Sequence, residues 1–178
     1  MSYSTPRTWV AGEYPTAAEF NQEIRDNISF LANPPGCRVY HNTTQSVSDN
    51  TITVVSFNSE RFDTDTMHDT SSNNSRLTIK TAGLYLVTFT GVFAQGSDYA
   101  RVYADIQLNG ATAIAIDDKA TPAIAHSPGV RVSTVYKLAV NDYLQARVYH
   151  DNTANTARNL LNTGNYSPEF AAVRIGAG

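Results

Sequence analysis

The sequence predicts an all-β sandwich or jelly roll that follows one short N-terminal helix. From Cys37 onward, β-branched and aromatic residues recur in short runs with a period close to two, and turn-forming residues separate the runs. Before that point, one segment has a helical period instead. Only 16% of the 178 residues are charged, which suits a β-rich protein whose surface relies on Ser, Thr, Asn and Gln. The length suits one sandwich with an appendage.

Residues 1–14 contain Pro6 and Gly12 and show no clear period, which indicates an extended arm. Such an arm is ordered only where something packs on it. Its single tryptophan, Trp9, is the side chain expected to anchor it.

The next segment, YPTAAEFNQEIRDNISFLANPPG, predicts a helix of about 16 residues. Thr16 and Glu19 have the spacing of a capping box, and the Pro-Pro-Gly run at 34–36 ends the helix. One stripe of this helix is apolar and consists of Ala17, Phe20, Ile24, Ile28 and Leu31.

This stripe needs a partner, because a helix of this length is marginal alone. Two interpretations stay open: the stripe packs on the chain's own β domain, or it contacts symmetry mates or another protein. We divide the chain into an arm and helix that form an anchor, residues 1–35, and a head, residues 36–178.

The head contains about eight to ten expected strands and no helical period. The alternation places Tyr85, Val87 and Phe89 on one core-facing side of their strand. The expected strand segments are 37–42, 51–57, 75–80, 83–94, 99–109, 111–117, 130–140, 142–150 and 169–176. Strands in this number, spaced in this way, are typical of a sandwich or jelly roll.

Composition excludes several classes of function. The formal net charge of -3 leaves no excess of cations for nucleic acid or anionic lipid. No apolar run is long enough to span a bilayer, and no secretory signal is present, so we expect a soluble protein made in the cytoplasm. Cys37 is the only cysteine, which excludes an intrachain disulfide.

The chain shows no arrangement expected of an enzyme or a cofactor site. No nucleophile lies beside a recognisable base, and no Gly-rich phosphate loop is present. The four histidines, at 41, 68, 126 and 150, lack the spacing of a metal motif. We therefore expect a protein that is not an enzyme and binds no cofactor.

One acidic loop is the exception to this absence of ligand groups. The segment DTDTMHDTSSNN, residues 63–74, supplies Asp63, Asp65 and Asp69, whose oxygens are ligands that calcium prefers. The loop lacks the Gly and the terminal Glu of an EF-hand. A solvated turn is the expected structure, and calcium binding is the alternative.

Three stretches of the head carry a family resemblance: TVVSFNSERFDTDTMHDTSSNNSRLTIKTAGLYLVTFTGVFA, VSTVYKLAVNDYLQARVYHD and SPEFAAVRIG. Together they resemble the complement-type, tumour-necrosis-factor-like (TNF-like) jelly roll of bacterial and phage proteins. The family's Gly-x-Tyr at the start of a long strand occurs here as Gly83, Leu84 and Tyr85. Its Gly-Asp before the penultimate strand is replaced by Asn141 and Asp142, a mild departure because Asn tolerates left-handed backbone.

The leader TWVAGEYPTAAEFNQEIRDNISFL is similar to one found in tail and minor structural proteins of phages that infect Gram-positive bacteria. The resemblance implies a non-enzymatic virion protein, made in the host cytoplasm. Its arm and helix would dock on other capsid or tail proteins, and its head would decorate the capsid or contact the host. The alternative is a bacterial, non-viral surface or secreted adhesin of the same fold.

The resemblance also implies a homotrimer, because jelly rolls of this family pack around a threefold axis. We expect Tyr143, Tyr149 and Phe170 at the interface between subunits; the alternative is two half-exposed strand tyrosines and a core phenylalanine. Polar loops would contact a ligand such as a host-surface glycan. These loops are 94–98, 118–128 and 151–166.

Overall fold

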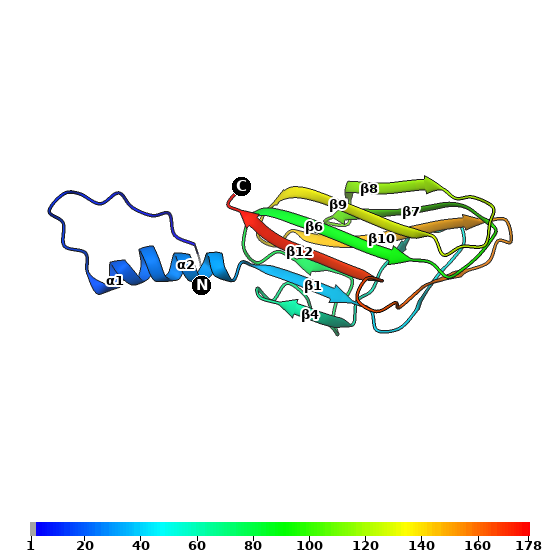
Figure 1. Cartoon of the computed structure of the whole chain (residues 1–178), viewed down its shortest axis with the longest axis horizontal. Helices are drawn as coiled ribbons and strands as arrows, with labels where there is room; N and C mark the ends of the chain where they lie inside the picture. Colours follow the sequence, from blue (N-terminus) through cyan, green and yellow to red (C-terminus); the bar gives the residue numbers. More distant parts are fainter. Residues whose placement is uncertain (1–2) are drawn as a thin grey trace.

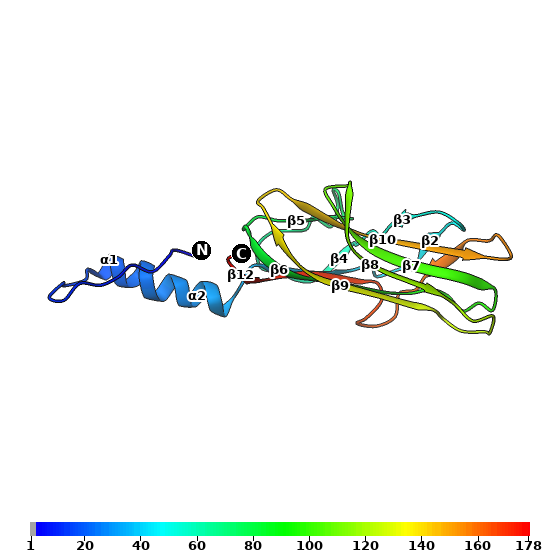
Figure 2. The same ribbon diagram turned by 90° about the horizontal axis from the view of Figure 1, so that it is seen from above.

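The computed structural model describes residues 3–178 and consists of a helical rod joined end to end with a β head (Figure 1). The rod projects from one end of the head in both views (Figure 2). The helix ends at Ala32 and the first strand begins at Gly36. No helix within residues 3–178 is long and apolar enough to cross a membrane.

The helix has three consecutive parts: α1 (Ala17–Phe20), a π-helical segment η1 (Asn21–Asp26) and α2 (Asn27–Ala32). The predicted capping box is present, because the Thr16 side chain accepts from the Glu19 amide and Glu19 binds the Thr16 amide. The π segment was not predicted. The stripe spacing averages 3.5 residues per turn, close to the 3.6 of an α-helix, so it gave no indication of a π turn.

The head contains twelve strands within the described residues. They are β1 (Gly36–Tyr40), β2 (Gln45–Val47), β3 (Thr53–Val54), β4 (Ser59–Asp63), β5 (Leu77–Thr78), β6 (Gly83–Val92), β7 (Tyr99–Leu108), β8 (Thr112–Ala120), β9 (Gly129–Leu138), β10 (Tyr143–Asn152), β11 (Arg158–Leu160) and β12 (Glu169–Gly176). Their arrangement confirms the predicted all-β fold with a short N-terminal helix. The sequence missed β2, β4 and β11, which are short and contain few apolar residues.

Two antiparallel sheets form the layers of the sandwich. The first has the order β4-β1-β12-β6-β9, and the second has the order β3-β10-β7-β8 with β5 beside β10. A small third sheet pairs β11 with β2. Because the strands that pair are mostly distant in the sequence, the head is held by long-range contacts and not by local hairpins alone.

The core lies between the two sheets, and its members come from the head only. The core face predicted for β6 is confirmed, since Tyr85, Val87 and Phe89 are all buried. In β10, Leu144 and Val148 are buried as well. No residue before Cys37 belongs to this hydrophobic cluster. Each element of the head thus buries one apolar face without any contribution from the rod.

Candidate functional site

The N-terminal arm folds back along the helix and covers one side of it (Figure 1). Tyr3 packs on Phe30 with ring centroids 6.2 Å apart, and Trp9 stacks on Phe20 at 6.1 Å. Between these contacts, the Ser4 amide donates to the Asn27 side chain at 3.0 Å. The arm is therefore ordered by the helix, and Trp9 contacts the stripe residue Phe20.

Arg7 fastens the middle of the arm by ion pairs. Its guanidinium pairs with Glu13 and with Glu19, and its backbone amide donates to Glu23 at 3.0 Å. The Thr16 hydrogen bonds, together with Arg7, lower the pKa of the Glu19 carboxyl, which therefore stays ionised for this pair.

The apolar stripe of the helix stays exposed in this single chain. Phe20, Ile24, Ile28 and Leu31 have exposed fractions of 48, 45, 60 and 68%. Trp9 of the arm covers part of Phe20, and Leu31 lines the hollow at the joint with the head. Most of the stripe has no partner within residues 3–178, because the rod projects away from the head (Figure 2). The interpretation in which the stripe packs on its own head is therefore wrong for the single chain.

A second apolar surface lies on the outer face of the first sheet, at the end next to the helix. Val173 of β12 is directly opposite Leu86 of β6, which is opposite Val135 of β9. Leu86 and Val135 are 42 and 51% exposed. Beside this row, Ile175 lines a hollow of about 320 Å³ at the joint, together with Leu31 of the stripe.

Phe170 is not an interface residue. It is 1% exposed in β12, and its ring packs on Phe57 at 5.6 Å and on Phe89 at 6.3 Å. The structure thus corrects the sequence prediction in favour of the core alternative. The outer face of β12 carries Ala171, Val173 and Ile175 instead, because side chains alternate along a strand.

Tyr143 and Tyr149 lie half-buried on the outer face of the second sheet, and both have partners within the chain. The Arg76 guanidinium stacks on Tyr143 at 4.1 Å. The Tyr149 hydroxyl donates to the Asn50 side chain at 2.8 Å, and its ring meets Tyr103 edge on. The interface role of both tyrosines stays a prediction.

The same outer face contains a buried ion pair that the sequence did not indicate. Asp105 of β7 is 1% exposed and accepts two hydrogen bonds from Arg147, at 2.8 and 2.5 Å. The Tyr103 hydroxyl donates to the same carboxylate. Burial and the Asp105 carboxylate raise the pKa of Tyr103 to about 12, so the hydroxyl stays a donor.

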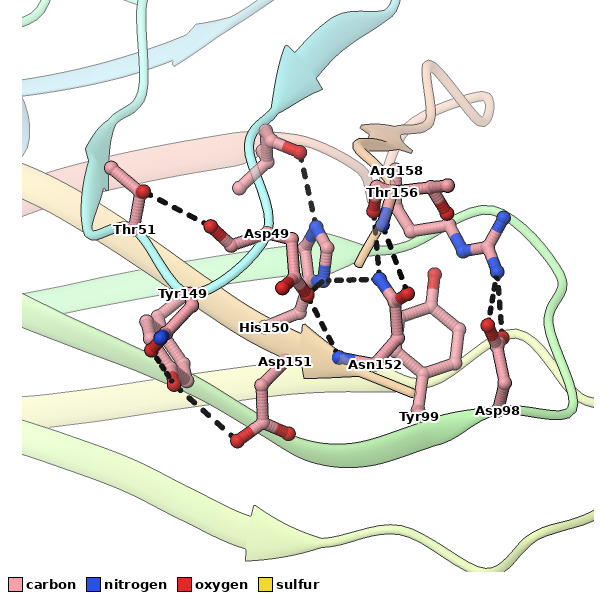
Figure 3. Close-up of polar contacts among 12 residues, drawn as sticks. Asp49, Thr51, Asp98, Tyr99, Tyr149, His150, Asp151, Asn152, Thr156 and Arg158 are labelled. Carbon is pink, nitrogen blue, oxygen red and sulfur yellow. Dashed lines mark hydrogen bonds and ion pairs between the residues drawn. The ribbon is translucent and has the colours of Figure 1, made fainter. Parts of the chain in front are cut away.

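A polar network ties the loops together at the end of the head opposite the rod (Figure 3). His150, which is fully buried, donates from Nε2 to the Val47 carbonyl at 3.0 Å, so Nδ1 is free to accept from the Asn152 amide at 3.3 Å. Asp49 accepts from the Asn152 backbone at 2.8 Å. Asn152 also bonds both ways with Thr156.

Arg158 extends this network to the 94–98 loop. Its guanidinium donates to both Asp98 oxygens, at 2.6 and 2.8 Å, and lies 5.7 Å from the Tyr99 ring (Figure 3). The 118–128 loop joins through a bridge between Gly96 and His126. The three loops expected to bind a ligand are therefore held at one end of the head, on a rigid support.

The acidic loop does not gather its carboxylates at one point. Asp63 accepts from the Asp65 and His68 amides, and Asp69 accepts from the Ser71 and Ser72 amides. The Ser71 and Ser72 bonds lower the pKa of Asp69 to about 2. Among residues 3–178, no group of three His, Cys, Asp or Glu side chains is placed to hold a metal ion. The carboxylates instead cap the turns of their own loop.

This loop walls a hollow of about 530 Å³ on the head. Glu60 of β4, Arg76 and Lys80 line it with polar residues of the loop. On its wall, His68 is buried with Nδ1 2.9 Å from the Glu60 carboxylate and Nε2 3.1 Å from the Asn74 carbonyl oxygen. The hollow is lined mainly by hydrogen-bonding and charged groups, so it suits a polar ligand.

Cys37 and His41 lack the features of catalytic groups. Cys37 is fully buried in the core, and this burial raises the pKa of its thiol, so the reactive thiolate does not form at neutral pH. Burial lowers the pKa of His41, which contacts the Thr43 hydroxyl at 3.2 Å.

Comparison with known proteins gives a fold and no family. No protein-family model and no curated protein matches the chain. A structure of Eiger TNF from S. frugiperda aligns with a TM-score of 0.61 at 14% identity, covering 81% of this chain and 94% of that one. Murine APRIL at pH 5.0 aligns with a TM-score of 0.60 at 11% identity, covering 79 and 98%. The head is a TNF-like jelly roll.

The TNF-like head confirms the fold that the sequence motifs implied. Gly83 begins β6, and no larger residue fits there, since an added Cβ would lie 2.6 Å from the Gly176 carbonyl oxygen. Asn141, in place of the family's Gly, has a φ of 72°, the left-handed conformation that Asn tolerates. At these identities the similarity describes the fold, and function has to be argued from the surfaces of this chain.

Proposed function

We propose that this chain is a non-enzymatic structural protein of a phage virion, a homotrimer whose arm and helix dock on the particle and whose TNF-like heads project from it. The observation that carries the proposal is the separation of surfaces. An exposed apolar stripe lies on the rod. The polar loops 94–98, 118–128 and 151–166, which hydrogen bonds join to one another, lie at the far end of the head.

The trimer is supported by two apolar surfaces that lie next to each other. Leu31 of the stripe and Ile175 beside the sheet row line one hollow at the joint, so the exposed stripe continues into the row of Val173, Leu86 and Val135. Exposed apolar area of this kind is typical of an interface. A closed cyclic assembly would bury both surfaces without leaving an open end.

The docking role is supported by the rod's independence from the head. The rod contributes nothing to the head's core, and its arm presents Val10 and Tyr14, which are 71 and 94% exposed. The segment that carries them, just before α1, lies at the end of the rod far from the head (Figure 1). They would contact capsid or tail proteins, while the head contacts a host-surface glycan.

Light scattering at micromolar concentration is expected to give three times the chain mass of 19.4 kDa. Changing Ile24 and Ile28 together to aspartate should shift the protein toward monomer, because each change puts a charge on the stripe. The matched control is Ile124→Asp, at a position that is 62% exposed in a head loop. A clean wild-type monomer would contradict the trimer.

Deleting residues 1–35 is expected to leave a folded head that no longer attaches to phage particles. The head should keep its β circular-dichroism spectrum and a cooperative melt, since the hydrophobic cluster begins at Cys37. Attachment would be measured by co-sedimentation with particles that lack this protein. If the truncated chain still bound them as the full chain does, the anchor assignment would be wrong.

A further inference from the structure

We infer that the 530 Å³ hollow beside residues 66–73 is a binding site for an anionic saccharide, a hydroxyl-rich ligand that carries a carboxylate or a phosphate. The inference rests on the proposed role of the head as a binding module. It does not depend on the trimer or on the particle.

The first argument is the balance of free charge in this hollow. Eight of the thirteen Lys and Arg side chains of the chain form ion pairs with carboxylates. Within residues 3–178, the cations that have no carboxylate within 4 Å are Arg76, Lys80, Arg131, Lys137 and Arg174. Two of these five, Arg76 and Lys80, line the one hollow.

The acidic groups of the hollow are already engaged. Glu60 contacts His68 at 2.9 Å, and Asp69 accepts three hydrogen bonds from Ser71 and Ser72, each 2.8 to 3.0 Å long. Arg76 and Lys80 have no carboxylate partner among the described residues, so an anionic group of a ligand would supply the missing acceptor.

The second argument is the rest of the lining. Thr66, Thr70, Ser72, Asn73 and Thr78 line the hollow and supply hydroxyl and amide groups. Such groups both donate and accept, as sugar hydroxyls do. The volume lies within the roughly 300 to 1,000 Å³ of small-molecule sites.

The third argument is that Arg76, and the backbone segment that carries both cations, are held in place. The Arg76 guanidinium lies 4.1 Å above the Tyr143 ring, and Thr78 and Leu77 of β5 tie the segment to β10. His68, which also lines the hollow, is held by its backbone amide on Asp63 and by its ring on Glu60. Because the site is preformed, little ordering is needed when a ligand binds.

The test is an NMR titration of the full-length chain at low ionic strength with glucuronate, glucose 6-phosphate, inorganic phosphate and glucose. Both acidic sugars are expected to shift the amide signals of residues 66–80, and glucose is not. Lys80→Gln should weaken binding of both acidic sugars about tenfold, the loss expected for one charge-assisted hydrogen bond. The matched control Lys137→Gln, at another unpaired cation outside the hollow, should leave binding unchanged.

Several outcomes would overturn the inference. Neither acidic sugar binding, or equal weakening by Lys80→Gln and Lys137→Gln, would remove the site. Inorganic phosphate binding as tightly as glucose 6-phosphate would remove the saccharide part. A response to only one acidic sugar supports the site and names the charged group that it selects. Because the titration needs neither trimer nor particle, its failure is separable from a monomeric mass or from loss of attachment.

Discussion

Changing Phe170 to alanine is expected to lower the free energy of unfolding by about 3 to 5 kcal/mol, the usual cost of deleting a buried aromatic ring. Phe170 is 1% exposed and packs on Phe57 and on Phe89 of the neighbouring strand, so its removal leaves a cavity that two rigid rings cannot fill. Urea denaturation followed by circular dichroism would measure the loss.

The control for this change is Phe62→Ala on the edge strand β4, where the side chain is 43% exposed. It should cost about 1 kcal/mol or less. Equal losses for the two variants would mean that Phe170 does not hold the core together, and its assignment to a subunit interface would return.

Changing Asp105 to alanine is expected to cost a similar amount, about 3 to 5 kcal/mol, because it leaves the Arg147 guanidinium without its partner in a mostly buried position. The Tyr103 hydroxyl would also lose its acceptor. The double change Asp105→Leu with Arg147→Met should recover much of the loss, since no charge then stays unpaired. Denaturant unfolding of the three proteins measures all these differences.

The matched control here is Asp118→Ala, which breaks the ion pair with Arg101. This pair is exposed, since the Arg101 and Asp118 side chains have exposed fractions of 49 and 39%. Water screens such a pair, so the expected loss is about 1 kcal/mol or less. If Asp118→Ala lowered the free energy of unfolding as much as Asp105→Ala, burial would not explain the cost of breaking the Asp105–Arg147 pair.

Local pattern was sufficient to predict the layers of the head. The period of two in β6 identified which side chains face the core, because only one face of that strand carries a continuous set of large apolar residues. The same logic failed for β12, where Phe170 and Ala172 alternate with Val173 and Ile175. Both faces of that strand are apolar, so periodicity could not assign Phe170 to the inner face.

The polar sites could not be predicted, since they join residues that are distant in the sequence. His150 bonds to Val47 across 103 positions, and Arg147 bonds to Asp105 across 42. Arg76 and Lys80 lie close to the acidic loop in sequence. The sequence could not indicate that the carboxylates near these cations contact other groups, Asp69 the Ser72 amide and Glu60 the His68 ring. Within the described part of the chain, Arg76 and Lys80 are left without a carboxylate partner.

The direction of β1 determines how the protein responds to mechanical force. The rod leads directly into β1, which lies along the long axis of the molecule and pairs with β12 on one side and β4 on the other (Figure 1). Inter-strand hydrogen bonds run perpendicular to the strands. A pull on the rod, with the far end of the head held, would load these bonds in shear and all at once, whereas a perpendicular pull would break them one after another. The fold therefore resists tension best along the line from the rod to the far end of the head.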